Sequence, residues 1–184
     1  MINKANPSIY GWRNAEMTGQ DLADHIMNGF AFSPGVLKPS ASGRKPSTKD
    51  IKFAQILAID IDNDIKTHNS LTKKYDKRIK TIEEGYWTYE AAKVDNFIKE
   101  NAILIYTTPS HKPDFERFRI VFVMNKMIAN PTDYRNAITQ LIERFGGDKS
   151  CSNIERLFYG NRDCDLEYFG DNILNIPENM SQLL

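Results

Sequence analysis

The segment from Gln55 to Asp64, QILAIDIDND, combines apolar residues with two carboxylates in a pattern that suits metal chemistry. Its apolar run is typical of a strand buried on both faces, and Asp60 and Asp62 interrupt its C-terminal end. Side chains two residues apart on a strand point to the same side, so these carboxylates repel each other unless a cation lies between them. The pattern therefore indicates a divalent-cation site. A strand that ends in an ordinary acidic turn is the alternative.

A second group of polar residues follows another apolar segment. Ser110 and His111 lie in TTPSHKP, directly after the predicted strand AILIY (102–106), and sheet enzymes commonly place functional residues at such strand ends. Arg117 and Arg119 alternate with a phenylalanine in RFRIVFVM (117–124), so both guanidinium groups project from one face of a third predicted strand. We therefore predict a hairpin with one cationic face. The alternatives are a surface ion pair for Arg117 and a simple turn role for His111.

Asp148 and Arg156 complete the set of candidate residues. Asp148 follows a Gly-Gly pair, where it either caps the next turn or serves as a metal ligand. Together these residue types fit phosphoryl transfer from a nucleoside triphosphate, in which the protein positions the reactants and neutralises charge. In this interpretation Asp60, Asp62 and Asp148 hold two metal ions. The histidine, the hydroxyl groups and the arginines grip the triphosphate.

A basic loop precedes the acidic strand. Residues 33–50, SPGVLKPSASGRKPSTKD, are rich in proline, glycine, serine and lysine and show no periodicity, which predicts a mobile loop. Arg44 and Lys45 near its centre are candidate nucleotide-binding residues, because the loop ends where the acidic strand begins and can close over phosphates there. The alternative is a solvated basic linker.

The composition is that of an ordinary globular protein, and 184 residues suffice for one domain with a sizeable core. The formal net charge is zero, so any nucleic-acid surface must be a local patch. The two cysteines and three histidines form no zinc pattern, and we predict no zinc. We expect a cytoplasmic protein without a membrane partner, because no apolar run approaches membrane-spanning length and the N-terminus lacks a signal-peptide core.

Periodicity and capping residues predict both helices and strands. The predicted helices are 18–28, capped by Thr18; 88–100, capped by Thr88; and 131–145, closed by a Gly-Gly pair. Further strands are predicted at 30–32, 154–159 and 166–168, and an exposed helical arm at 66–84. Tyr10 and Trp12 are predicted to anchor an N-terminal edge segment. The chain thus divides into an N-terminal part with the basic loop (1–50), a metal- and nucleotide-binding core (51–165) and an apolar tail that docks on the body (166–184).

The order of these motifs resembles that of the archaeo-eukaryotic primase (AEP) superfamily, the primase-polymerases. LAIDIDN resembles the acidic pair of that superfamily, YTTPSHKP followed by RFRIVF its Ser/His motif, and DKSCSNIERLFYGN its later Asp with an Arg eight residues on. The likeness runs from about residue 29 to residue 160. Pro109 occupies the usual serine position, so Thr108 or Ser110 supplies the hydroxyl. The resemblance implies an α+β fold with mixed or antiparallel sheets and flanking helices, an AEP primase catalytic core with an RRM-like subdomain.

The resemblance also implies residue roles. Asp60, Asp62 and Asp148 take the metal-ligand positions for Mg²⁺ or Mn²⁺, His111 the triphosphate role, and Arg156 a nucleotide contact. We expect removal of Asp60 or Asp62 to abolish synthesis with little unfolding, because each belongs to a repelling pair.

The expected function is that of a DNA-dependent primase-polymerase, which makes and extends primers in replication. Its expected partners are NTP or dNTP, a single-stranded DNA template with its primer, and a helicase or accessory domain, with the chain itself monomeric. Two alternatives remain: a non-catalytic nucleic-acid-binding or replication-initiator domain, and a metal-dependent nuclease that uses the same acidic cluster.

Overall fold

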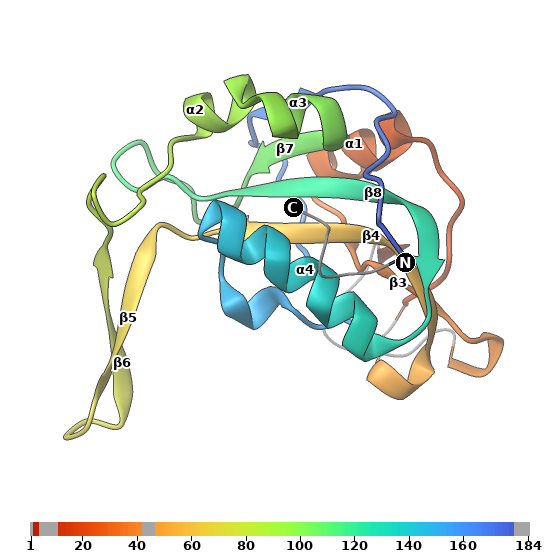
Figure 1. The fold of residues 1–184 in the computed structure, drawn as a ribbon, viewed down its shortest axis with the longest axis horizontal. Coiled ribbons are helices and arrows are strands. Elements are labelled where there is room, and N and C mark those ends of the chain that lie inside the picture. The colour runs from red at the N-terminus through yellow and green to blue at the C-terminus, as the bar shows by residue number, and fades with distance from the viewer. Residues whose placement is uncertain (1, 4–10, 42–46, 179–184) are drawn as a thin grey trace.

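A five-stranded antiparallel sheet forms the centre of the molecule (Figure 1). The structure is a computed structural model that describes residues 2–3, 11–41 and 47–178. The strand order is β3-β4-β8-β7-β9. These strands are β3 (Gly35–Leu37), β4 (Ile51–Ile61), β7 (Leu104–Thr107), β8 (Phe118–Ile128) and β9 (Leu166–Tyr168). Two further pairs of strands are β1 (Ile2–Asn3) with β2 (Ala31–Phe32), and β5 (Asp64–Asn69) with β6 (Lys74–Ile79).

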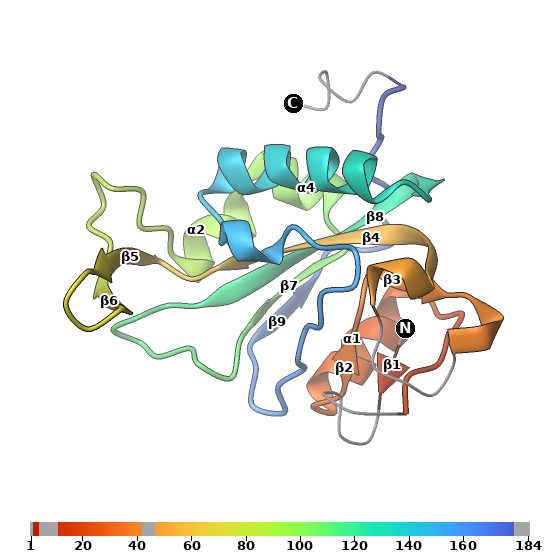
Figure 2. The ribbon, with the colours of Figure 1, turned by 90° about the horizontal axis from the view of Figure 1, so that it is seen from below.

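Helices cover both faces of the central sheet (Figure 2). One face carries α4 (Pro131–Phe145), α2 (Tyr89–Val94) and α3 (Asn96–Asn101). The other face carries α1 (Gly19–Met27). Short 3-10 turns lie at Pro39–Ala41, Thr48–Asp50 and Lys149–Cys151. The predicted class, α+β with an antiparallel sheet and flanking helices, is confirmed.

The C-terminal part of β4, residues 57–61, is buried on both faces, as its apolar sequence predicted. Leu57, Ile59 and Ile61 pack into the core on the α4 side, whereas Ala58 packs into a second core that includes α1. Because side chains alternate along a strand, Asp60 faces the same side as Ala58. A carboxylate therefore enters the interior at the end of the strand, where it is only 7% exposed.

The helices begin and end as their sequences predict, with one exception. Thr18 caps α1 in a capping box with Asp21, and Gly146 ends α4 in the left-handed conformation at φ 66°. The predicted helix 88–100, capped by Thr88, is two helices instead of one. Asp95 has an extended backbone and accepts a hydrogen bond from the Ile98 N–H at 3.0 Å, so it caps a new helix and interrupts the first.

The segment 66–84, predicted to be helical, is instead largely a two-stranded ribbon, β5–β6. The side chain of Asn69 accepts hydrogen bonds from the backbone N–H groups of Leu71 and Thr72, and Lys73 adopts φ 54°, so the chain reverses direction between the strands. Cross-strand pairing then continues from Asn69–Lys74 to Asp64–Ile79. The prediction of an exposed arm is correct, since the ribbon projects away from the sheet (Figure 1).

Two more predicted elements differ from the structure. Residues 154–159 form no regular strand: a turn at Ile154–Glu155 precedes a single bridge from Phe158 to Phe32 of β2. The predicted loop 33–50 contains β3, which pairs with β4 and extends the sheet. Two of its three residues are buried. Arg44 and Lys45 lie outside the described residues.

Both ends of the described chain pack on the body. Trp12 is fully buried, which confirms its predicted role as an anchor, whereas Tyr10 lies outside the described residues. Leu174 bridges to Met124 on β8, and Ile176 is 3% exposed, so the tail docks as predicted as far as that residue. Within the described parts of the chain, no helix has both the length and the apolar character needed to cross a membrane.

Candidate active site

Asp60 belongs to a polar ladder across three neighbouring strands. The register places Arg119 on β8 opposite both Asp60 on β4 and Tyr106 on β7. The guanidinium group of Arg119 pairs with the Asp60 carboxylate and also donates to the Tyr106 hydroxyl at 3.0 Å and to the Tyr159 carbonyl at 2.7 Å. A buried charge is thereby paired and hydrogen-bonded, which offsets its desolvation.

The second oxygen of Asp60 accepts a hydrogen bond from the Cys151 thiol at 3.2 Å. Burial, followed by the charge of Asp60, raises the pKa of Cys151 to about 12, so this thiol stays protonated at neutral pH and acts as a donor. Both carboxylate oxygens of Asp60 therefore have partners within the protein. The expectation that Asp60 can be removed with little unfolding is not supported by these contacts, since its removal leaves Arg119 buried without its carboxylate.

Asp62 follows β4 and is more accessible, with 24% of its side chain exposed. Its carboxylate lies 3.7 Å from the ammonium group of Lys66 and 4.0 Å from the guanidinium group of Arg117. Burial and the neighbouring charge of Asp60 raise the pKa of Asp62 above its ordinary value. The two nearby cations therefore do not fully offset the burial of ionised Asp62 and its repulsion by Asp60.

Asp148 is brought to this point by the turn after α4. Its backbone N–H donates to the Asp60 carbonyl at 2.8 Å, and its side chain accepts from the Ser150 N–H at 2.8 Å. The turn can approach the strand closely because Gly147 has no side chain: a Cβ at this position would lie only 3.1 Å from the Asp60 carbonyl oxygen. The structure thus brings Asp148 to the end of β4, close to Asp60 and Asp62, from which it is far apart in sequence.

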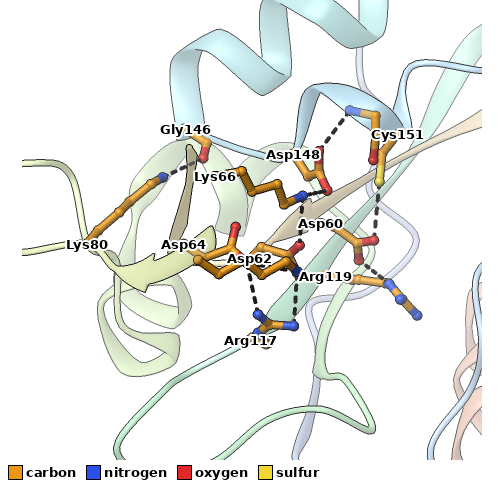
Figure 3. A network of polar contacts seen from close by, with 12 residues as sticks. Asp60, Asp62, Asp64, Lys66, Lys80, Arg117, Arg119, Gly146, Asp148 and Cys151 are labelled. Atoms are coloured by element: carbon orange, nitrogen blue, oxygen red, sulfur yellow. Dashed lines mark hydrogen bonds and ion pairs between the residues drawn. The ribbon is translucent and has the colours of Figure 1, made fainter. Parts of the chain in front are cut away.

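Lys66, which the sequence interpretation did not include, stands between two of these carboxylates (Figure 3). Its ammonium group donates to Asp148 at 2.7 Å and lies near Asp62. Burial opposes ionisation of Asp148, yet hydrogen bonds from Lys66 and Ser150 and the charge of Lys66 lower the pKa of Asp148 to about 2. Lys66 is on β5, so only recognition of residues 64–69 as a strand could have directed attention to it.

Arg117 carries the other cationic group beside Asp62. It donates to Asp64 at 3.0 Å and stacks over the Phe115 ring at 4.3 Å. Within the part of the chain that the structure describes, its Nε is buried without a hydrogen-bond partner. Because buried donors are normally paired, this nitrogen is an exception that carries an energetic cost.

The turn after β7 presents the predicted hydroxyl groups. The His111 N–H donates to the Thr108 carbonyl at 3.0 Å and closes the turn that holds Ser110. The Arg117 backbone N–H donates to His111 Nδ1 at 3.2 Å. A neutral His111 ring must therefore carry its proton on Nε2, which makes that nitrogen a donor.

Two pockets meet at Asp62. The first has a volume of about 420 Å³ and is lined by Asp62, Thr108, Pro109, Ser110, Arg117, Arg119, Tyr159 and Gly160. The second, of about 260 Å³, is lined by Asp62, Asn63, Asp64, Lys66, Lys80, Gly146, Gly147, Asp148 and Lys149. The predicted hydroxyl and arginine residues thus line the first pocket, and the third aspartate lines the second.

The remaining candidate residues lie outside these linings. Arg156 donates to the Ser150 carbonyl at 3.3 Å and so supports the turn that carries Asp148. Its nucleotide contact stays a prediction, as do those of Arg44 and Lys45. Across residues 2–3, 11–41 and 47–178, no group of three or more histidine, cysteine or acidic side chains is arranged to hold a metal ion. Lys66 instead lies between Asp62 and Asp148, and Arg117 lies between Asp62 and Asp64.

Comparison with known proteins supports the fold. No family model matches this sequence, and no curated protein matches it. The structure is similar to the AEP domain of the primase-polymerase of cyanophage S-2L, with a TM-score of 0.50 and 12% sequence identity over 91% of this chain and 77% of that chain. An identity this low shows the fold alone. The chain therefore has an AEP-like fold.

Proposed function

We propose that this protein catalyses template-directed nucleotidyl transfer and makes and extends primers as a primase-polymerase. The observation that carries the proposal is the meeting of three aspartates at the end of the central sheet, beside a pocket with hydroxyl and arginine side chains. Fold similarity to a primase-polymerase domain supports the same reaction class.

In this proposal a divalent cation takes the position between Asp62 and Asp148 where the Lys66 ammonium lies. The Lys66 ammonium lies between Asp62 and Asp148 and has 34% of its side chain exposed, so a cation already occupies this position and can leave it toward solvent. Asp62 and Asp148 would hold Mg²⁺ or Mn²⁺ there. Asp60 would contribute the oxygen that receives only a thiol hydrogen bond, a weak one. The bound ions would neutralise phosphate charge and acidify an attacking sugar hydroxyl.

The 420 Å³ pocket suits the triphosphate. Thr108 and Ser110 line it with Arg117, whose guanidinium group would pair with phosphate oxygens. His111 adds a donor from the same turn. Arg119 lines the pocket as well, but its bonds to Asp60 and Tyr106 give it a positioning role for the carboxylate.

A metal-independent binding domain is the second candidate, and one observation favours it. Lys66, Arg117 and Arg119 already form ion pairs with Asp148, Asp64 and Asp60 without any metal ion. A domain that only binds nucleic acid needs no metal ion at these carboxylates. Their ion pairs with basic side chains can hold the acidic residues in place without one.

Extension of a labelled primer on a single-stranded template distinguishes these functions. We expect wild-type protein to extend the primer with Mg²⁺ or Mn²⁺, and Asp62→Asn and Asp148→Asn to lose at least 100-fold in rate, since each removes a ligand charge. Asp24→Asn, which makes the same change at an exposed position of α1 outside both pocket linings, is the matched control and should retain most activity. Absence of extension by folded wild-type protein would favour the scaffold, and metal-dependent loss of the labelled strand without nucleotides would indicate a nuclease.

A further inference from the structure

The β5–β6 ribbon contributes nothing to either core, which raises the question of what it contacts. Strand β6 is exposed along its whole length, and Tyr75 is 64% exposed. A two-stranded ribbon is only marginally stable in water by itself. Its base is held by polar contacts, from Lys80 to the Gly146 carbonyl at 3.0 Å and from Lys66 to Asp148 at 2.7 Å. A ribbon of this kind gains stability from a partner.

The charge of the ribbon identifies the chemistry of that partner. Residues 64–80 contain six basic side chains and two acidic ones, although the whole chain has a net charge of zero. The basic residues are Lys66, Lys73, Lys74, Lys77, Arg78 and Lys80, and the acidic residues are Asp64 and Asp76. Lys66, Lys77 and Arg78 form ion pairs with Asp148, Asp64 and Glu84. The positive charge that remains, with Lys73 and Lys74 near the tip, suits a polyanion.

One face of the ribbon is continuous with the candidate active site. Direct cross-strand pairs share a face, so the pairs Lys66–Lys77 and His68–Tyr75 lie on the same side, here called the site-side face. Lys66 lies on this face and donates to Asp148, so this face of the ribbon is turned toward the site (Figure 3). Farther out, the rings of His68 and Tyr75 meet edge to face with centroids 5.3 Å apart. Cationic groups thus lead from the site to an exposed aromatic pair.

The path of the chain at the base sets this direction. Asn63, immediately after Asp62, has φ 49° and is 1% exposed. Its side chain donates to the carbonyl groups of Trp87 and Glu116, and accepts from the Trp87 N–H. Asparagine tolerates this left-handed conformation better than most residues. The ribbon therefore leaves the site at a bend that is fixed by the body of the protein.

We propose that the site-side face of the β5–β6 ribbon binds the sugar-phosphate backbone of the primer–template duplex. The inference rests on the proposed function, because the duplex is the product that leaves such a site. Six residues at about 3.4 Å each give a ribbon of roughly 20 Å, comparable to the rise of about six base pairs. A two-stranded ribbon also fits the major groove. Lys77, which pairs with Asp64 at 3.3 Å but has 51% of its side chain exposed, would turn to phosphate oxygens, and Tyr75 would pack against sugars.

Binding to a labelled duplex with a 5′ single-stranded overhang tests the proposal without nucleotides or metal. Fluorescence anisotropy is measured between about 50 and 200 mM salt. The variant Tyr75→Ser/Lys77→Gln should bind roughly tenfold more weakly, and its salt slope should fall by about 1 for the lost phosphate contact. Lys74→Gln makes the same change of charge on the opposite face and should weaken binding less than about twofold.

A shortened ribbon provides the second test. Replacing residues 67–76 with Asn-Gly keeps the Lys66–Lys77 pair, makes a two-residue hairpin and removes the aromatic pair. Duplex binding at the wild-type level by both this variant and Tyr75→Ser/Lys77→Gln would overturn the inference. An equal loss of duplex affinity in Lys74→Gln would contradict the assignment to the site-side face. Equally tight, ribbon-dependent binding of a single strand would contradict the assignment of the duplex as the ligand.

Failure of the ribbon and failure of the proposed function give different results. Binding is measured in the absence of synthesis, so ribbon-dependent duplex binding by a protein that adds no nucleotide would refute the catalytic proposal and leave the binding surface intact. Primer extension with unchanged apparent affinity for the duplex in the shortened variant would refute the ribbon's role and leave catalysis intact.

Discussion

The ammonium group of Lys66 controls how Asp148 titrates. The pKa of Asp148 is about 2, below its ordinary value of 3.8, so its ionisation stabilises the folded protein above pH 3.8. This stabilisation is lost as the pH falls from 3.8 through about 2. In Lys66→Met we expect the pKa of Asp148 to rise by at least one unit, because the remaining burial opposes ionisation. NMR titration of the Asp148 carboxyl carbon measures both values.

Lys77→Met provides the matched control for this titration. Lys77 lies on the same ribbon face but pairs with Asp64 at 3.3 Å. Its removal should leave the pKa of Asp148 within about 0.3 units of wild type, as expected for a charge that does not contact the carboxylate. An unchanged Asp148 pKa in Lys66→Met would show that Lys66 does not hold this carboxylate in solution.

Neutralising Asp60 and neutralising Asp62 should change the stability of the folded protein in opposite directions. Asp60→Asn leaves Arg119 buried without its ion pair and should lower the free energy of unfolding by about 3 kcal/mol. The raised pKa of Asp62 means that its ionised form destabilises the folded state at neutral pH. Asp62→Asn should therefore raise Tm by about 2 °C in the absence of metal. Urea and thermal unfolding measure both changes, and equal destabilisation by the two substitutions would contradict the contacts described.

Sequence alone could predict the acidic residues of the site but not their partners. Asp60 and Asp62 stand out because their spacing on an apolar strand is a local property. The contacts of Asp60 with Arg119 and Cys151 depend on strand register and on a turn distant in sequence. Lys66 was missed for the same reason, because its position depends on a ribbon that was predicted to be a helix.

At the scale of elements, the turn after α4 sets the distance between Asp148 and β4. A Cβ on Gly147 would lie 3.1 Å from the Asp60 carbonyl oxygen, so Gly147→Ala must push the turn outward by a few tenths of an ångström. We expect the rate of primer extension to fall about tenfold, since small displacements of catalytic groups are costly. Single-turnover kinetics at saturating nucleotide measure this rate.

Gly146→Ala is the control that distinguishes an effect of the turn's position on the rate from an effect on folding stability. Gly146 has φ 66°, and a Cβ there meets only the Lys80 ammonium at 3.6 Å. This substitution should cost about 1 kcal/mol of stability through the left-handed backbone while the extension rate stays within about twofold of wild type. A rate loss in Gly146→Ala as large as that in Gly147→Ala would show that close approach to Asp60 is not the cause.

The elements that were predicted correctly carry strong local patterns, and those that were not depend on tertiary contacts. Helix α4 combines an apolar stripe with caps at both ends. The ribbon lacks a buried face, so its charged sequence shows neither helical nor strand periodicity. The break between α2 and α3 arises because Asp95 caps a new helix, a choice that apolar spacing does not reveal.

At the scale of the whole molecule, the sheet is buried on both faces and the acidic residues gather at one end of it. Two pockets meet there at Asp62. The β5–β6 ribbon follows β4 at this end of the sheet (Figure 1). The class of fold could be predicted because a mixture of amphipathic helices and apolar strands requires it. With zero net charge, the protein should bind nucleic acid only through such local features and with strong salt dependence.

Single-nucleotide addition to a labelled primer tests the central claim most directly. The primer is annealed to four templates that differ only in the next base, and each nucleotide is supplied separately with Mn²⁺. Template-directed transfer predicts that wild-type protein adds the complementary nucleotide at least tenfold faster than the others, and that Asp148→Asn adds none. No addition by folded wild-type protein, or addition that does not depend on the template base, would contradict the claim.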